Sequence, residues 1–167
     1  MGESPAGMPR PRSPGRKVLA MSAEIAERNF VVEASRDRVW RLIGKVIFSC
    51  LPGMENIEIL DENNFRAVLR IKITLFNLGL KVEGEMVDIS PPESLAVRLA
   101  LTGPGGLRMD QRVSVALASL EKGKTGLACK ATVERMEFLF QSLLLRQARR
   151  FASATFAAIE KRLQEVV

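Results

Sequence analysis

Few residues of this chain have the types and spacing that catalysis requires. The sequence contains no His and no Tyr, so the commonest general base and metal ligand is missing. Cys50 and Cys129 show neither metal-ligand spacing nor a disulfide framework, which predicts two buried, reduced thiols. The composition argues against most hydrolytic and metal-dependent chemistry, and no metal, cofactor or catalytic residue is expected.

Carboxylates are the remaining candidates for acid–base chemistry. Glu83 and Glu85 share one face of an expected strand, as an acid–base pair would, but they alternate with apolar residues such as Met86. Asp110 has the strand parity of Arg112, which favours an outward cross-strand charge partner. All three carboxylates are therefore expected on the solvated side of a sheet.

Gln111 is a polar residue on an apolar strand face, because its parity matches Met109 and Val113. An amide buried there needs a hydrogen-bond partner, which the backbone, water or the carbonyl of a ligand would supply. The nearby run Gly103–Gly106 is glycine-rich, but a strand pattern follows it where a phosphate-binding loop needs a helix. A hairpin turn is the favoured interpretation of this run.

The net charge of +6 is spread unevenly along the chain. Residues 1–20 carry four basic residues and one acidic residue, 4 − 1 = +3, in a stretch rich in Pro, Gly and Ser. This composition predicts a disordered basic tail over residues 1–22 and a single folded domain over 23–167. No apolar run reaches the ~18 residues of a membrane-spanning helix, so a cytoplasmic protein is expected.

A second group of basic residues, Arg146, Arg149 and Arg150, lies near the C-terminus. The chain has one Trp, no Tyr and no interleaving of basic with aromatic residues, so no nucleic-acid partner is expected. A solvated helix face is the favoured interpretation. A second interpretation stays open, in which these arginines and the apolar segment 138–145 rest on the anionic inner face of a membrane.

The elements that position these residues are indicated by the apolar pattern. A first strand is predicted over 24–33, after which Ser35 offers a helix N-cap. One short helix is expected to end near Gly44, and a second short helical turn to cover 46–50. Two short helices therefore follow the first strand.

From residue 54 onward the apolar period is two, which predicts about six further strands joined by short hairpins. One of these turns is expected to begin at Asn77. The last thirty residues, 138–167, contain neither Gly nor Pro and carry an apolar stripe at helical spacing. The order predicts an α+β fold in which an antiparallel sheet curves around one long C-terminal helix. A sheet curved in this way seldom fills its own interior, so a hydrophobic cavity is expected between sheet and helix.

The apolar faces of these elements predict the wall and mouth of that cavity. The expected ligand-binding residues are Trp40, Leu51, Met54, Phe65, Leu69, Leu80, Val82, Met86, Leu99, Met109, Gln111, Val113, Phe140, Leu144 and Phe151. Such a lining favours holding a molecule over transforming it.

Several short blocks of sequence carry a family resemblance. They are Phe30-Val31-Val32, Val39-Trp40, Cys50-Leu51-Pro52-Gly53-Met54-Glu55 and Asp88-Ile89-Ser90-Pro91-Pro92. Together with the final helix they resemble the CoxG family of carbon monoxide dehydrogenase proteins, within the START-like, or SRPBCC, helix-grip superfamily. The resemblance implies a curved seven-stranded antiparallel sheet gripping the C-terminal helix around a hydrophobic tunnel. It also implies association with a molybdenum-containing carbon monoxide dehydrogenase-like complex, either by recruiting the enzyme to a membrane or by handling a quinone.

The function expected from these observations is a non-enzymatic carrier for a hydrophobic small molecule, a quinone or a lipid. One alternative is an enzyme of the aromatic cyclase or dehydratase kind, which needs Asp110 or Glu85 on the cavity wall. The other is an assembly or membrane-recruitment factor for a dehydrogenase, which needs an exposed apolar patch.

Overall fold

The computed structural model describes residues 18, 19, 23–73 and 75–167. Its elements are β1 Val18–Leu19, β2 Ala23–Val32, α1 Arg36–Ser49, β3 Met54–Ile59, β4 Asn64–Ile73, β5 Phe76–Ser90, β6 Ser94–Gly103, a 3-10 turn at Pro104–Gly106, β7 Leu107–Ser119, β8 Thr125–Glu137 and α2 Gln141–Val166. The expected tail over residues 1–22 lies outside the described residues except for Val18 and Leu19, which pair with Glu137 and Met136 of β8.

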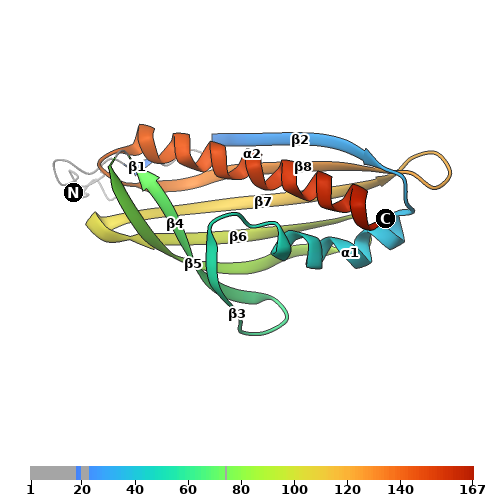
Figure 1. The fold of residues 1–167 in the computed structure, drawn as a ribbon, viewed down its shortest axis with the longest axis horizontal. Coiled ribbons are helices and arrows are strands. Elements are labelled where there is room, and N and C mark those ends of the chain that lie inside the picture. Colours follow the sequence, from blue (N-terminus) through green and yellow to red (C-terminus); the bar gives the residue numbers. More distant parts are fainter. Residues whose placement is uncertain (1–17, 20–22, 74) are drawn as a thin grey trace, which may run out of the picture.

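One antiparallel sheet forms the body of the structure (Figure 1). Its seven longer strands lie in the order β2-β8-β7-β6-β5-β4-β3, and β1 joins the end of β8 beside β2. Side chains alternate between the two faces as the pattern predicts, since Phe65, Ala67 and Leu69 are buried while Arg66 and Arg70 are exposed. The seven-stranded curved sheet around a C-terminal helix is confirmed.

Helix α1 begins where the sequence indicates and continues further than expected. Ser35 is the N-cap, and its side-chain Oγ accepts a hydrogen bond from the Arg38 backbone N–H at 3.4 Å. The helix runs through Gly44 to Ser49, so the expectation of two short helices is wrong. Gly in a helix interior costs about 1 kcal/mol relative to Ala, and burial of Ile43 and Val46 on either side of Gly44 is sufficient to hold the turn.

The hairpin between β4 and β5 is tighter than the sequence suggests. Asn77 pairs with Lys72 inside the ladder, and the strands already pair at Ile73 and Phe76. The turn therefore lies between Ile73 and Phe76, and the expectation that it begins at Asn77 is wrong. The run Gly103–Gly106 does form a turn between two strands, in which Gly105 takes the positive φ of 73° that favours glycine.

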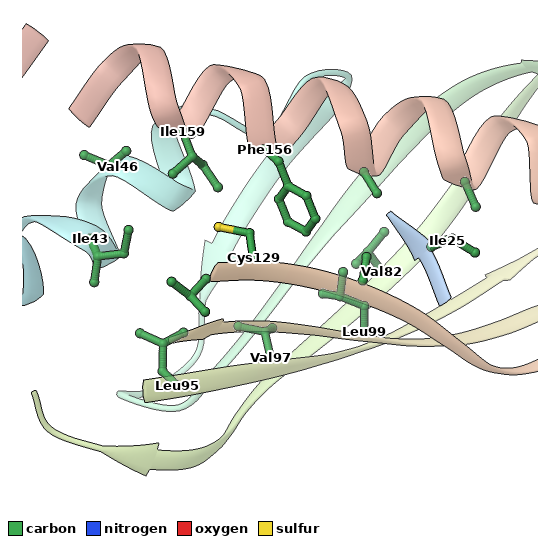
Figure 2. Close-up of a cluster of buried hydrophobic side chains, with 14 of the residues drawn as sticks. Ile25, Ile43, Val46, Val82, Leu95, Val97, Leu99, Cys129, Phe156 and Ile159 are labelled. Atoms are coloured by element: carbon green, nitrogen blue, oxygen red, sulfur yellow. The ribbon is translucent and has the colours of Figure 1, made fainter. Parts of the chain in front are cut away.

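Helix α2 lies along the concave face of the sheet, and its C-terminal end reaches α1 (Figure 1). Figure 2 shows Phe156 and Ile159 projecting from α2 toward the strands, with Cys129 of β8 between helix and sheet. Two polar contacts tie α2 to the edge strand β2: Arg28 Nε lies 3.0 Å from Glu160 Oε1, and Gln164 Nε2 donates to the Val31 carbonyl at 2.9 Å. The predicted long helix is confirmed, and the space beneath it is where a ligand would lie.

Candidate functional site

Two hydrophobic cavities lie between the sheet and the helices. The larger, cavity A, is bounded by α1, the C-terminal half of α2 and strands β4 to β7. Its volume, taken as the space open to the centres of water-sized molecules, is about 60 Å³. Its lining consists of Gly44, Ile47, Phe48, Phe65, Met86, Leu95, Val97, Leu99, Val113, Val115, Thr155 and Ile159.

Cavity B is smaller and lies nearer the start of α2. Its volume on the same measure is about 20 Å³. Its lining consists of Met54, Leu69, Ile71, Leu80, Leu99, Leu101, Met109, Gln111, Leu144, Gln147, Ala148 and Phe151. Leu99 is common to both linings, so this side chain of β6 forms a wall between the two cavities (Figure 2). A shift of Leu99 would join them into one tunnel beneath α2.

Eleven of the fifteen residues expected at the ligand site line one or both cavities. In cavity A these are Phe65, Met86, Leu99 and Val113; in cavity B they are Met54, Leu69, Leu80, Leu99, Met109, Gln111, Leu144 and Phe151. They come from six different elements, β3 to β7 and α2, so the strand parity evident in the sequence also fixes which side chains meet. Their contact with a ligand stays a prediction.

Four expected residues, Trp40, Leu51, Val82 and Phe140, line neither cavity. Val82 is fully buried in the core, while Trp40 and Leu51 are half-buried outside the two linings. Phe140 is 57% exposed because it is the N-cap of α2, ahead of the first helical turn, and its ring packs edge-on against Phe138. The helical stripe thus begins one turn later than the sequence suggests.

Helix α1 contributes three lining residues that the sequence reasoning missed. Gly44, Ile47 and Phe48 stand at i, i+3 and i+4 and therefore share one helix face. Phe48 also meets Phe65 edge-to-face, with 5.2 Å between ring centroids. A continuous helix would reveal this face in the sequence, but the sequence predicts a helix that stops at Gly44.

The cavity walls carry no ionisable side chain among the described residues. Glu83 and Glu85 are exposed or half-exposed on the outer face of the sheet, and Asp110 lies 3.8 Å from Arg108 of its own strand. Burial raises the pKa of the Cys129 thiol to about 12, so this side chain stays protonated and is a poor nucleophile. The arrangement can desolvate an apolar molecule, but it offers no acid, base or nucleophile to act on one.

Two polar side chains reach the cavities without a hydrogen-bond partner. Thr155 Oγ1 is buried at cavity A, and Gln111 Nε2 is buried at cavity B. Buried polar groups are nearly always paired, so an unpaired donor at a cavity wall marks a place where a ligand or water can bind.

Several solved structures share this fold. A conserved protein from Geobacillus kaustophilus has a TM-score of 0.65 and 19% sequence identity, over 83% of this chain and 94% of its own. A START superfamily protein from Mycobacterium smegmatis has a TM-score of 0.59 and 13% identity, over 87% of this chain and 100% of its own. Truncated norcoclaurine synthase from Thalictrum flavum has a TM-score of 0.57 and 14% identity, over 91% of this chain and 96% of its own. At these identities the likeness shows the fold alone.

Comparison with curated proteins found no match. None of the described helices is long and apolar enough to cross a membrane. The family comparison is more specific than the structural one, because CoxG, a family described as a subunit of carbon monoxide dehydrogenase, matches residues 29–164. This range runs from β2 through both cavity linings almost to the end of α2. The chain therefore belongs to the CoxG family of carbon monoxide dehydrogenase proteins.

Proposed function

We propose that this protein is a non-enzymatic carrier that holds a quinone or a lipid between its sheet and α2. The observation that supports this function is a pair of cavities whose walls are apolar apart from Gln111, Gln147 and Thr155. Removing an apolar ligand from water contributes about 25 cal/mol per Å² of apolar surface buried. The walls can therefore supply affinity without directed polar contacts along most of the ligand.

The cavities must widen to accept such a ligand. A water needs roughly 10–15 Å³ on this measure, so the 60 Å³ of cavity A corresponds to only a few water molecules. Met54, Met86 and Met109 line the cavities, and methionine side chains change shape at low cost. A ligand is expected to displace these side chains and Leu99, which joins the two cavities.

The proposal is tested by asking what the protein binds. Purified protein is incubated with bacterial lipid extract and analysed by native mass spectrometry, and a prenylated quinone is titrated while the fluorescence of Trp40, the single Trp, is recorded. Trp40 stands one helical turn before Gly44 of cavity A, so a bound quinone is expected to quench it. A protein that retains no lipid species and shows no quenching would not be a carrier.

A peripheral membrane contact would let the carrier load a ligand that is insoluble in water. Leu75 is 91% exposed, Leu139 61% and Phe140 57%. Figure 1 places the β4–β5 hairpin, which carries Leu75, at the same end of the molecule as the start of α2. Arg149 and Arg150 are exposed and Arg146 is half-exposed or more on the following turns of α2, so apolar side chains and positive charge lie close together, as binding to anionic lipid requires.

This contact has its own test. Co-sedimentation with vesicles of phosphatidylcholine and phosphatidylglycerol is expected to fall when Phe140 or Leu75 is replaced by Ser, and to weaken at high salt. Vesicles of phosphatidylcholine alone are the control, because they lack the negative charge. Equal binding to both kinds of vesicle would remove the role of the arginines.

Membership of the family also supports an accessory role beside a molybdenum-containing carbon monoxide dehydrogenase-like complex. The carrier would then deliver its quinone to that enzyme or return it to the membrane. Co-purification of the tagged protein with a large molybdenum-containing partner tests this association, and purification of the carrier alone from cells that express the enzyme would count against it.

A further inference from the structure

Gln111 is the most deeply buried polar group that faces a cavity. Its side chain is 2% exposed, and its Nε2 atom has no hydrogen-bond partner. Two other buried polar atoms of the described residues also lack one: Thr155 Oγ1 and Glu134 Oε1. Glu134 lines neither cavity, and a threonine hydroxyl can rotate to relieve its position. The amide of Gln111 has no such freedom and bears the cost of lost hydration.

The position of Gln111 in the sheet aims its side chain at cavity B. It lies in the middle of β7, paired with Leu99 of β6 on one side and Val133 of β8 on the other. Across the cavity from this strand stand Leu144 and Ala148 of α2. The register between β7 and β8 shifts immediately beside Gln111, between Asp110 and Gln111. Such irregularities often re-aim side chains next to binding sites.

A resident water is a poor explanation for this amide. Cavity B, with about 20 Å³ open to water centres, has room for one water molecule. A buried water typically needs two to four polar partners, while the side chains of the lining offer only Gln111 and the half-buried Gln147. A carbonyl or ether oxygen at the end of an apolar molecule needs just one donor. The wall of cavity B therefore suits a ligand oxygen better than a water.

We propose that Gln111 is the polar anchor of the ligand, donating a hydrogen bond from Nε2 to a carbonyl-type oxygen of an otherwise apolar guest in cavity B. This inference rests on the proposed carrier function and narrows it. The guest carries an accepting oxygen at or near one end, and its apolar remainder extends past Leu99 into cavity A. A pure hydrocarbon of the same size binds less selectively, because it leaves the amide unpaired.

The inference predicts an unusual effect on the ligand-free protein. Gln111→Met keeps the length of the side chain and removes the amide, so the free protein is expected to keep or raise its melting temperature. An amide with a structural role would give the opposite result, since methionine would abolish its hydrogen bonds. A clear fall in the melting temperature of Gln111→Met would therefore overturn the proposal.

The binding test uses two matched probes, 2-undecanone and undecane, which differ by one carbonyl oxygen. Affinities are measured by isothermal titration calorimetry for the wild type, for Gln111→Met and for Gln164→Met. Gln164 is a matched control because it is exposed on α2 and bonds the Val31 carbonyl outside both cavities. Gln111→Met is expected to weaken binding of the ketone about 5- to 10-fold, as loss of one hydrogen bond does. Its affinity for undecane is expected to stay within about twofold of wild type or to rise, and Gln164→Met is expected to change neither.

The outcomes separate this inference from the proposed function. If wild type binds both probes and Gln111→Met weakens both or neither alike, the amide holds a water or nothing, and the inference is wrong while the carrier function stands. If wild type binds neither the ketone nor the alkane, the carrier function itself is wrong, and the anchor falls with it.

Discussion

Replacement of Gly44 by leucine is expected to stabilise the protein while blocking cavity A. Gly44 lies inside α1 and lines the cavity, and a Cβ placed there would meet no atom within 4 Å. Helix propensity alone should contribute about 0.8–1 kcal/mol when Gly becomes Ala or Leu. Full burial of a leucine side chain contributes about 1.5–3 kcal/mol, from which crowding in a small space subtracts about 1 kcal/mol or more. The expected gain is therefore about 1 kcal/mol for Gly44→Ala and about 2 kcal/mol for Gly44→Leu.

The assay combines unfolding with ligand binding. Free energies of unfolding come from urea titrations in the absence of ligand, and affinity for a prenylated quinone comes from the quenching of Trp40. Gly44→Ala should gain stability and keep most of its affinity, since one methyl group leaves most of the cavity open. Gly44→Leu should gain more stability and lose binding at least about tenfold, because the side chain occupies the space that the ligand requires.

A matched control and a contrary result make this prediction sharp. Lys45→Leu adds the same side chain at the next position of α1, where the residue is exposed, and should leave quinone binding unchanged. If Gly44→Leu destabilised the protein, the space beside α1 would be too small to be a cavity. If the variant bound quinone as wild type does, cavity A would not be the site.

Three further changes test other parts of the structure. Leu99→Ala should lower the free energy of unfolding by about 3 kcal/mol in urea titrations, toward the low end for buried leucines because space already exists on both sides, and should admit longer ligands by joining the cavities; a loss below about 1 kcal/mol would show that Leu99 is not a wall. Cys50 is half-buried and Cys129 fully buried, so a thiol reagent at pH 8 should label Cys50 first and Cys129 only on unfolding; mass spectrometry of labelled peptides decides the order. Since the pKa of Cys129 is raised to about 12 in the folded protein, the stability that its protonated thiol contributes is fully present below about pH 9 and is lost as the pH rises toward 12; the free energy of unfolding of wild type should therefore fall more steeply over that window than that of Cys129→Ala, and parallel curves would contradict the assignment. Ser35→Ala should cost about 1 kcal/mol through loss of the N-cap, and circular dichroism during thermal unfolding measures the shift.

The sheet could be predicted from sequence because its parity is a strictly local property. The alternation of Phe65, Ala67 and Leu69 with arginines requires one buried face, and a slip of one residue would bury the charges. The cavity residues on β4 to β7 follow from that parity. Val82 has the same parity but lies in the packed core, because parity identifies the face of a strand and not how closely the helix approaches it.

The helical part of the site was harder to predict, because helix ends depend on tertiary contacts. Gly44 has the sequence signature of a helix end, yet packing of Ile43 and Val46 against the core carries α1 through it. Phe140 shows the converse error, since the absence of Gly and Pro before α2 gives no signal that the helix begins only at Gln141. Each helix end misplaced by a turn removes or adds lining residues, among them Ile47 and Phe48.

Gly44 and Gln111 are both unfavourable choices by local rules. A glycine inside a helix and an unpaired amide inside a core each reduce stability, and alanine or methionine would fit the same positions without that cost. Both residues face a cavity, one where a missing side chain leaves room and the other where a donor has no partner. Such departures from local preference are expected at sites that serve a ligand and not the fold. The carrier function accounts for both at once, because room and an unpaired donor are what an apolar guest with one oxygen requires.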